Sequence, residues 1–288
     1  MTNNANSADI SVIIPTHNRA GLIGRALESI RAQTLRPREV IVVDDGSTDS
    51  TRQLLADRYP ECTVLARPRA GVSAARNAGI RRASAEWIAL LDSDDEWLPE
   101  KLASQWQYVQ GRGQDHGSGN AAARLIHCEE NWIRDGRRLA PRPHQRKAGG
   151  RVFRQCLPGC TIAPSAVLMH REVFDDYGLF DEAMPACEDY DLWLRVCARE
   201  AVALLPEPLV NRYGGHADQL SQRYWGMDRF RVRALARLLE TVALDAGDRA
   251  ATIATLHAKL DILAGGARRR GRTDDVRRYA ALRERFAT

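Results

Sequence analysis

Short apolar runs alternate with helical patterns of hydrophobic residues over the first 110 positions of the chain. The run at 10–15 is rich in β-branched residues, and apolar side chains at helical spacing follow it at 22–30. Three further apolar runs repeat this arrangement, at 39–43, 62–66 and 87–91. Continuously apolar strands that alternate with amphipathic helices are typical of a parallel sheet covered on both faces. The pattern therefore predicts a doubly wound, mostly parallel α/β sheet in residues 9–110.

The pattern becomes irregular in residues 111–150, which are rich in Gly, Pro and charge. Only 123–133 is typical of a strand there, with Asp135-Gly136 as the turn of a hairpin. Farther along we expect three elements, a strand at 165–170, a helix at 189–198 and a strand at 201–205. This part of the chain therefore extends the α/β region with elements less regular than those of the first half.

The C-terminal part has a helical pattern. From about Trp225 onward, Leu and Ala recur at helical spacing, with breaks at Asp248 and at Gly265-Gly266. This spacing predicts two or three packed helices. We therefore divide the chain into a domain at 1–222, with halves at 9–110 and 111–222, and a helical, basic extension at 223–288.

Composition places the chain among globular proteins with a sizeable core, because 44% of its 288 residues are hydrophobic. No apolar run approaches the roughly 18 residues of a membrane span, and the N-terminus lacks the pattern of a secretory signal. We therefore expect a cytoplasmic protein. The six cysteines form no CxxC pair, which favours reduced, buried thiols and leaves a metal site at Cys156 and Cys160 as the alternative.

Positive charge is concentrated at the C-terminal end. The chain carries a net charge of +5, and residues 265–288 contain eight Arg against three acidic residues, so the remainder is neutral overall. Such a segment favours contact with an anionic surface, either lipid headgroups at the inner face of a membrane or nucleic acid. A solvated helix face would have the same composition, and this alternative stays open.

Polar clusters follow each of the first four predicted strands. They are PTHNR, DDGSTD, ARPRAGVSAARN and DSDDEW, in chain order. Because ligands in an open α/β sheet gather beyond the carboxyl ends of the strands, these clusters predict one pocket. Carboxylates beside Arg67, Arg69 and Arg76 suit a ligand with hydrogen-bond donors and phosphates, such as a nucleotide. Taken alone, the second cluster favours a helix cap over a ligand site.

The densest group of acids is Asp92-Ser93-Asp94-Asp95-Glu96. Asp92 and Asp94 offer hard oxygen ligands for Mg2+ or Mn2+, which bind through one or two carboxylates together with substrate phosphates. We expect Asp95 and Glu96 to have a structural role instead, at the charged first turn of a helix that starts near Pro99.

Five blocks of sequence, in this order and at these separations, resemble the inverting family 2 glycosyltransferases, whose catalytic domain has the GT-A fold. The blocks span about residues 9–220 and are ISVIIPTHNR, EVIVVDDGSTDST, GVSAARNAGI, WIALLDSDDEWLPEKL and GLFDEAMPACEDYDLWLR. The resemblance implies a catalytic domain at 1–222, with a nucleotide-sugar half at 9–110 and an acceptor half at 111–222.

The resemblance also implies roles for donor-site residues. Asp92-Ser93-Asp94 stands at the family's DxD motif, so Asp94 would bind a divalent cation, Mn2+ or Mg2+, and Asp92 would reach the ribose or the metal. Asp45 would accept from the nucleobase, typically the ring N–H of uracil. The implied nucleotide-sugar contacts are Pro15, Thr16, Asn18, Asp45, Arg76, Asp92 and Ser93.

The implied catalytic residues are Glu188 and Asp189, which stand at the family's ED motif, with Asp189 as the base and Glu188 beside it in the acceptor site. Inversion needs one base to deprotonate the acceptor hydroxyl, while a metal holds the departing diphosphate. After the last strand, Arg212 and His216 could reach the diphosphate or the metal once a loop closes, and we include His216 among the metal ligands. Three tryptophans could be core residues or acceptor platforms, namely Trp97, Trp132 and Trp193.

The chain lacks the QxxRW motif of the processive members, since Tyr224 separates Arg223 from Trp225. We therefore expect a non-processive enzyme that moves one sugar from a nucleotide-diphosphate sugar, with UDP favoured, to a hydroxyl of a cell-surface glycan or glycolipid. Two other functions remain open. A sugar-nucleotidyltransferase would show a Gly-rich phosphate loop, which PTHNRAGL lacks. A nucleic-acid-binding protein would act through the Arg-rich tail.

Overall fold

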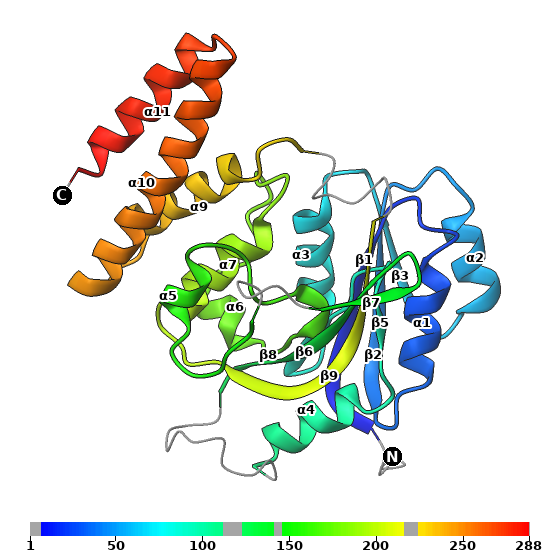
Figure 1. The fold of residues 1–288 in the computed structure, drawn as a ribbon. Coiled ribbons are helices and arrows are strands. Elements are labelled where there is room, and N and C mark those ends of the chain that lie inside the picture. Colours follow the sequence, from blue (N-terminus) through cyan, green and yellow to red (C-terminus); the bar gives the residue numbers. More distant parts are fainter. Residues whose placement is uncertain (1–6, 112–122, 141–145, 216–223, 288) are drawn as a thin grey trace.

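The computed structural model describes residues 7–111, 123–140, 146–215 and 224–287. A curled sheet with helices on both faces forms the larger part of the molecule, and a group of C-terminal helices packs at one side (Figure 1). The described strands form one sheet in the order β3-β2-β1-β4-β8-β6-β9-β5, and β7 pairs with β6. The expected α/β architecture is thus confirmed.

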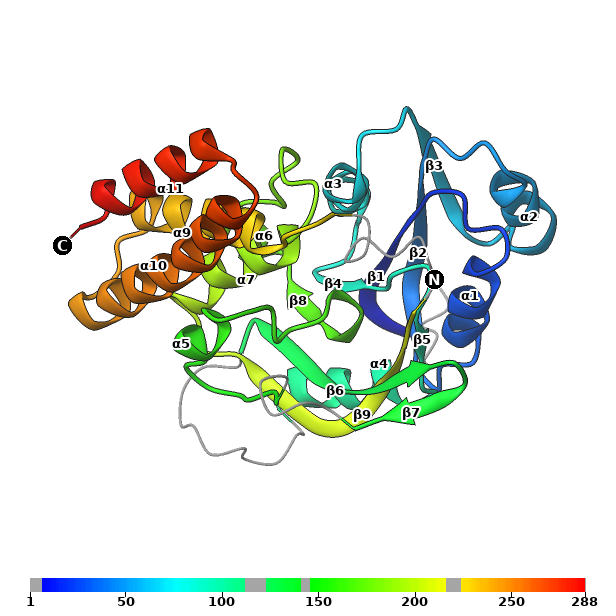
Figure 2. The same cartoon turned by 45° about the horizontal axis from the view of Figure 1, so that its top comes forward.

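The first half of the sheet is parallel, as the apolar runs predict. Strand β1 pairs in parallel with β2 and β4, and β2 pairs in parallel with β3. Helices α1 and α2 cover one face and α3 the other (Figures 1 and 2). The strand bounds are Ser7–Thr16 for β1, Arg36–Asp45 for β2, Thr63–Arg67 for β3 and Trp87–Leu90 for β4. The helices are Ile23–Arg31 for α1, Thr51–Arg58 for α2 and Val72–Arg82 for α3.

Burial on both faces explains why these strands are continuously apolar. Along β1, Ile13 belongs to the core cluster on the α3 side, whereas Val12 and Ile14 belong to the cluster on the α1 side. Alternate residues of a strand point to opposite faces, so a strand covered twice needs apolar residues at every position.

The second half of the sheet is mixed. Strand β8 is antiparallel to β4 and to β6, β9 is parallel to β6, and β5 is antiparallel to β9. The predicted hairpin is present between β6 and β7, where Asp135 and Gly136 both have positive φ. The strands are Glu96–Trp97 for β5, Leu125–Arg134 for β6, Arg137–Leu139 for β7, Leu168–His170 for β8 and Ala203–Gly214 for β9. The helices are Lys101–Val109 for α4, Phe153–Cys156 for α5, Glu172–Tyr177 for α6 and Glu188–Cys197 for α7.

Two expectations for this half need correction. The strand expected at 165–170 begins only at Leu168, because Pro164–Ala166 forms a 3-10 turn. The last strand runs to Gly214 instead of ending at Leu205, because β9 continues to pair along β6.

Among the described residues that follow, three helices are present, in agreement with the predicted helical tail. They are Asp228–Thr241 for α9, Ala246–Arg269 for α10 and Thr273–Arg285 for α11. The predicted breaks are wrong, because Asp248 lies in the first turn of α10, where its N–H donates to the Asp245 cap, and Gly265-Gly266 continues the helix. The chain turns at Gly271, whose φ of 66° is in the left-handed region.

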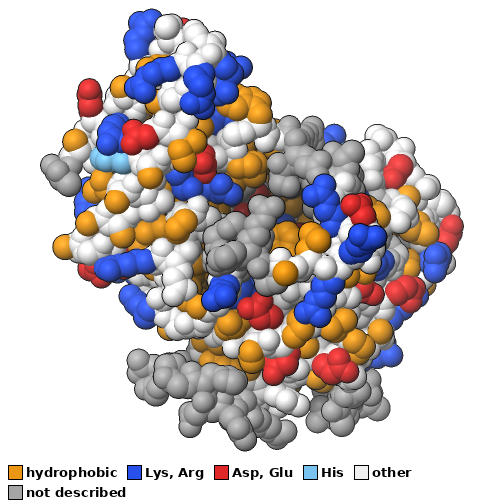
Figure 3. All heavy atoms as spheres, in the orientation of Figure 1, with side chains coloured by type: hydrophobic (Ala, Val, Ile, Leu, Met, Phe, Trp, Pro, Cys, Tyr) orange, Lys and Arg blue, Asp and Glu red, His pale blue; other side chains and the backbone are white. Residues whose placement is uncertain are grey.

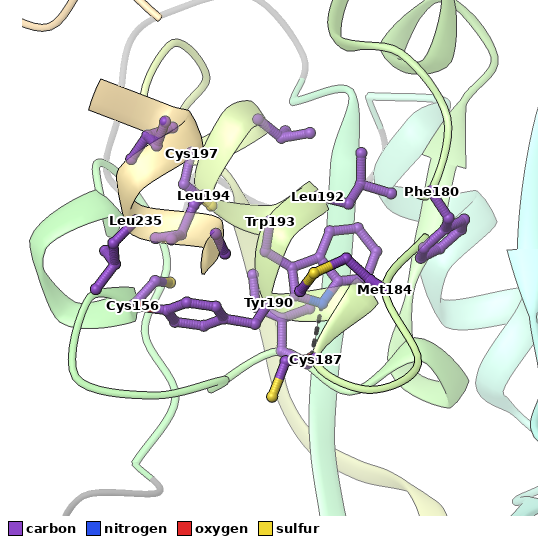
Figure 4. Packing of buried hydrophobic residues seen from close by; sticks show 14 of the residues in the cluster. Cys156, Phe180, Met184, Cys187, Tyr190, Leu192, Trp193, Leu194, Cys197 and Leu235 are labelled. Carbon is purple, nitrogen blue, oxygen red and sulfur yellow. Dashed lines mark hydrogen bonds between the residues drawn. The ribbon is translucent and has the colours of Figure 1, made fainter. Parts of the chain in front are cut away.

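The C-terminal helices share a core with the sheet. Trp193 and Tyr190 of α7 lie in one buried cluster with Leu235 of α9 and Leu256 of α10 (Figure 4). The hydrophobic core therefore runs across the boundary that we expect at 222/223, and the division into two domains stays a prediction. Within the described residues, no helix is both long and apolar enough to span a membrane.

Candidate active site

A cavity of about 920 Å³ opens at the carboxyl ends of β1, β2 and β4, where the starts of α3 and α7 converge. The polar clusters that follow the strands therefore meet at one edge of the sheet. Of the residues named from the sequence for donor, cation or base, all except His216 line this cavity: Pro15, Thr16, Asn18, Asp45, Arg76, Asp92, Ser93, Asp94, Glu188 and Asp189. His216 lies outside the described residues.

Asp45 and Asn18 organise the side of the cavity formed by the loops after β1 and β2. Asp45 is only 4% exposed, and its carboxylate accepts the N–H groups of Ala70 at 2.9 Å and Gly71 at 2.7 Å. Gly71 has a φ of 100°, a conformation that favours glycine, so the turn that leads into α3 depends on a glycine at this position. Asn18 Oδ1 accepts the N–H of Thr48 at 2.8 Å and joins the loops after β1 and β2.

Two hydroxyl groups in the wall of the cavity have unused hydrogen-bonding capacity. Thr16 Oγ1 and Ser73 Oγ are buried, and neither has a partner within the described structure. Buried polar atoms are usually paired, so these two favour a polar ligand. Our sequence prediction missed Ser73, although it lies in the block GVSAARN at the start of α3.

Arg76 connects the two sides of the cavity. Its guanidinium, 2% exposed, donates to Asp92 Oδ1 at 2.7 Å and to Glu188 Oε1 at 2.6 Å. Burial and the neighbouring Asp189 carboxylate raise the pKa of Glu188, while the charge of Arg76 opposes this rise. The segment after β4 and the first turn of α7 are therefore held together through one buried cation, the Arg76 guanidinium.

The acidic segment after β4 divides into two parts. Asp92 and Asp94 are half-buried and line the cavity, whereas buried Asp95 accepts Ser165 Oγ at 2.6 Å and the N–H of Tyr213 at 3.2 Å. Burial raises the pKa of Asp95 to about 8. Asp95 therefore has the structural role that we expected.

Asp95 and Glu96 do not begin a helix, contrary to our expectation. Glu96 lies in β5 and accepts from Asn211 at 2.9 Å and from the Tyr213 hydroxyl at 2.7 Å. Helix α4 starts only at Lys101 and has no acid in its first turn. Strand β5 pairs with β9, and the contacts of Asp95 and Glu96 with residues of β9 add to this pairing. The two acids therefore join the segment after β4 to β9.

Asp92 and Asp94 fit a divalent cation by the chemistry of their donor atoms. Carboxylate oxygens suit hard cations, and Mg2+ is usually held by one or two protein carboxylates with phosphates and water completing the shell. The part of the chain that the structure describes brings together no three His, Cys, Asp or Glu side chains around one metal position. Among the described residues, the same result disfavours a metal site at Cys156 and Cys160.

Asp189 lies at the start of α7, on the cavity wall. The residue before this helix turn, Cys187, has a φ of 60°, which is rare for a residue other than glycine and is found at functional sites. Asp189 Oδ1 accepts the N–H of Tyr190 at 2.7 Å, and Oδ2 accepts the thiol of Cys160 at 3.2 Å. The dipole of α7 favours the ionised form of both acids in this turn.

Arg212 also lines the cavity, at the end of β9. It pairs with Glu130 at 3.3 Å and lies 3.8 Å from Asp95, and its guanidinium stacks over Trp132 at 4.5 Å. Trp97 and Trp193 are core residues, with 2% and 1% exposure. Among the three tryptophans considered from the sequence, these two are therefore excluded as acceptor platforms.

Comparison with known proteins agrees with this architecture. The chain is 30% identical over 200 residues to glycosyltransferase YwdF of Bacillus subtilis, covering 68% of this chain and 71% of YwdF. It is 28% identical over 228 residues to the amylovoran biosynthesis glycosyltransferase AmsB of Erwinia amylovora, covering 74% of each. Matches to five Rickettsia glycosyltransferases span between 28% and 65% of the length of those proteins.

Solved structures support the same fold. S. aureus TarS 1-349 in complex with UDP-GlcNAc superposes with a TM-score of 0.62 at 16% identity, covering 96% of this chain and 90% of TarS 1-349. The mannosyltransferase PcManGT from Pyrobaculum calidifontis, in complex with GDP-Man and Mn2+, gives a TM-score of 0.60 at 18% identity, covering 97% and 84%. These likenesses confirm the expected GT-A-type fold. The family model for glycosyl transferase family 2 matches residues 11–178, more than half of the sequence. The chain therefore belongs to glycosyl transferase family 2.

Proposed function

We propose that this protein transfers one sugar, with inversion, from a nucleotide-diphosphate sugar to an acceptor hydroxyl. The observation that carries the proposal is that Asp189 and the Asp92/Asp94 pair line one cavity, in which Arg76 bridges Asp92 and Glu188, the residue before Asp189. The cavity has a volume of about 920 Å³, which is within the range of pockets that bind small molecules such as a nucleotide-diphosphate sugar. The non-processive mode and a cell-surface glycan or glycolipid acceptor remain part of the proposal.

The nucleoside would lie on the β1/β2 side of the cavity. Thr16 and Asn18 would contact it, and Asp45 would accept the ring N–H of a uracil, which is why we favour a UDP-sugar. TarS is described with UDP-GlcNAc and PcManGT with GDP-Man, so both relatives of this fold support a nucleoside-diphosphate sugar as the donor class.

The sugar diphosphate would lie near Asp92, Ser93 and Asp94. A divalent cation held by Asp92 and Asp94, with His216 as a further candidate ligand, would neutralise the charge of the departing diphosphate. PcManGT is described with Mn2+, which supports this ion class. Arg76 keeps Asp92 in place through its 2.7 Å contact.

Asp189 would act as the base. Its carboxylate would accept the proton of the acceptor hydroxyl while that oxygen attacks the anomeric carbon from the face opposite the diphosphate. The bond between the anomeric carbon and the phosphate oxygen breaks, and the nucleoside diphosphate leaves with the electron pair. One base is sufficient because the leaving group departs as a stabilised anion.

A donor screen tests this proposal directly. With Mn2+ present, we expect release of the nucleoside diphosphate from one of the UDP-, GDP- or dTDP-sugars and its acceleration by an acceptor. D94A and D189N should each lower transfer by at least about 100-fold, because a cation ligand or the base is lost. E207Q, at an exposed position of β9, is the matched control and should keep wild-type activity.

The alternatives give different products in the same screen. A sugar-nucleotidyltransferase would release pyrophosphate instead of a nucleoside diphosphate. A nucleic-acid-binding protein would show strongly salt-dependent binding to DNA or RNA that D94A leaves unchanged. Full transfer activity of D189N would refute our choice of base.

We also propose that the C-terminal extension meets the anionic inner face of a membrane. Lys and Arg side chains gather where α10 and α11 meet, at the top of Figure 3. Arg268, Arg269, Arg270 and Arg272 are all exposed, and no acid among the described residues pairs with them. We call these four residues the turn arginines.

The arginines of α11 differ from the turn arginines because they form ion pairs. Each of its arginines pairs with an acid of the protein, in the pairs Arg277–Asp274, Arg278–Asp275, Arg283–Asp261 and Arg285–Glu240. Fewer arginines are therefore available to a partner than the sequence of residues 265–288 suggests.

An exposed tryptophan lies beside the turn arginines. Trp225 is 51% exposed, and the guanidinium groups of Arg229, Arg272 and Arg270 lie 3.8, 4.9 and 5.8 Å from its ring centroid. Aromatic rings with cationic side chains suit the headgroup region of a bilayer. Because Met227, two residues farther on, lines the cavity, this contact would bring a lipid-linked acceptor close to the site.

A further inference from the structure

The segment Leu157–Ile162 lies directly against the start of α7. The Tyr190 hydroxyl donates to the carbonyl of Leu157 at 2.6 Å, and Trp193 Nε1 donates to the carbonyl of Ile162 at 2.9 Å. Both aromatic rings lie in the buried cluster shown in Figure 4. Two core side chains of α7 therefore fix this segment, and it cannot shift independently of the helix.

Cys160 makes a third polar contact between this segment and α7. Its thiol lies 3.2 Å from Asp189 Oδ2 and also 3.2 Å from the carbonyl of Ile162. A thiol has one proton to donate, and an ionised carboxylate is a stronger acceptor than a neutral carbonyl. The S–H group should therefore point to Asp189.

The surroundings keep this thiol protonated. Enclosure by protein atoms and the negative charge of Asp189 raise the pKa of Cys160 well above its usual value. Cys156 acts in the same direction, and the more distant charge of Arg212 opposes it. The Cys160 residue as a whole is exposed, but its sulfur contacts Asp189 and the carbonyl of Ile162, and with this raised pKa the thiol stays protonated at neutral pH.

We propose that Cys160 is a positioning residue, whose thiol holds the Asp189 carboxylate in the orientation needed to accept the acceptor proton. With Oδ1 held by the Tyr190 N–H and Oδ2 by the thiol, the carboxylate plane is fixed and its remaining lone pairs are left for the cavity side. The inference depends on the proposed role of Asp189 as base. It adds a residue that no sequence motif indicated.

Kinetic variants separate positioning from simple packing. We expect C160A to lower kcat by about tenfold with little change in the donor KM, because a misoriented base affects the chemical step. C160S keeps an O–H donor and should recover most of this loss. C156A removes a buried thiol that contacts Thr161 and not Asp189, so it is the matched control and should keep the wild-type kcat. Wild-type kcat in C160A would overturn the proposal.

Thiol labelling tests the contact without using activity. In D189N the carboxylate charge is absent, so the thiolate of Cys160 should form more readily and react faster with a disulfide reagent, by about tenfold for each unit of pKa. Mass spectrometry assigns the label, and half-buried Cys62 serves as the internal control, whose rate should not change. An unchanged rate at Cys160 in D189N would refute the contact.

The kinetic and labelling experiments distinguish failure of this inference from failure of the proposed function. Failure of the function would appear as a wild-type enzyme that releases no nucleoside diphosphate from any donor. Failure of the inference would appear in an enzyme that does transfer sugar, as D189N labelling at the wild-type rate or as C160A with full kcat.

Discussion

Lys101 is the first residue of α4, and its side chain is fully buried. Its ammonium nitrogen lies 3.8 Å from the centroid of the Trp97 ring and 3.2 Å from the carbonyl oxygen of Val167. Burial lowers the pKa of Lys101 to about 7. Between pH 7 and the unfolded value near 10.4, the unfolded chain binds more protons than the native chain. The contribution of Lys101 to the free energy of unfolding should therefore rise with pH in this window.

We predict that K101M has a higher free energy of unfolding than the wild type at pH 7, by about 1–3 kcal/mol. The substitution replaces a buried charged side chain with an apolar side chain of similar length. The difference should shrink at about pH 9.5, where the wild-type lysine is neutral in more of the unfolded chains. Urea unfolding at the two pH values measures both effects.

Lys147 is the matched control for this prediction. It is also buried, with 2% of its side chain exposed, but it pairs with Glu130 at 3.1 Å. K147M should destabilise the protein because it removes a partner of a buried carboxylate. A stability difference between K101M and the wild type that does not depend on pH would contradict the assignment.

At the scale of elements, the contact between α3 and β1 fixes the side of the cavity where we propose that the nucleoside binds. Gly79 of α3 faces Ile13 of β1, and a Cβ on Gly79 would lie 2.4 Å from Ile13 Cγ2. Helix and strand can approach this closely only because Gly79 has no side chain. The start of α3 carries Arg76 and Ser73, so the spacing also determines where these side chains meet the cavity.

We predict that G79A lowers the free energy of unfolding by about 1–3 kcal/mol, because the added methyl group overpacks a close contact. It should also weaken nucleotide binding, since α3 must move away from β1. Gly21 has open space around its Cβ position, so G21A is the control and should change stability by no more than about 0.5 kcal/mol. Calorimetry of binding and thermal unfolding would test both, and equal effects of the two variants would refute the packing argument.

Elements that depend on local pattern could be predicted from the sequence, whereas those that depend on a distant partner could not. Periodicity and turn residues located the parallel strands and the hairpin at Asp135-Gly136. The length of β9 depends on its pairing with β6, and the continuity of α10 through Gly265-Gly266 depends on packing, so neither was visible in the local sequence.

The same distinction applies to the site. The acids at strand ends were found because parallel strands bring their carboxyl ends to one edge. The bridge from Arg76 to Glu188 joins residues 112 positions apart, and the contact of Cys160 with Asp189 joins residues 29 positions apart. Such contacts are products of tertiary packing, and a single sequence contains no local signal for them.

At the scale of the whole molecule, charge is distributed unevenly over the C-terminal helices. Within the part of the chain that the structure describes, no acid pairs with the turn arginines, while the arginines of α11 form ion pairs. This arrangement gives the proposed membrane contact a definite location, and it offers two sites where the same change of charge should have different effects.

We predict that R270Q/R272Q lowers binding to vesicles containing phosphatidylglycerol by about tenfold or more, because each basic residue near an anionic surface contributes about 1 kcal/mol. R277Q/R278Q removes the same charge from paired positions and should bind nearly as well as the wild type. Cosedimentation measures both variants, with phosphatidylcholine vesicles as the blank. Equal losses in the two variants would show that the total charge of the tail matters and not its location.

The shared core beneath α7 has a consequence for how this protein can change over evolutionary time. Residues of α9 and α10 cover the apolar back of α7, the helix whose first turn carries Glu188 and Asp189. A relative that exchanged these helices for another module would expose Trp193 and its neighbours unless the new module brought an apolar surface of matching shape. The extension and the helix that carries Glu188 and Asp189 therefore share one core, so exchange of the extension for another module is constrained by packing.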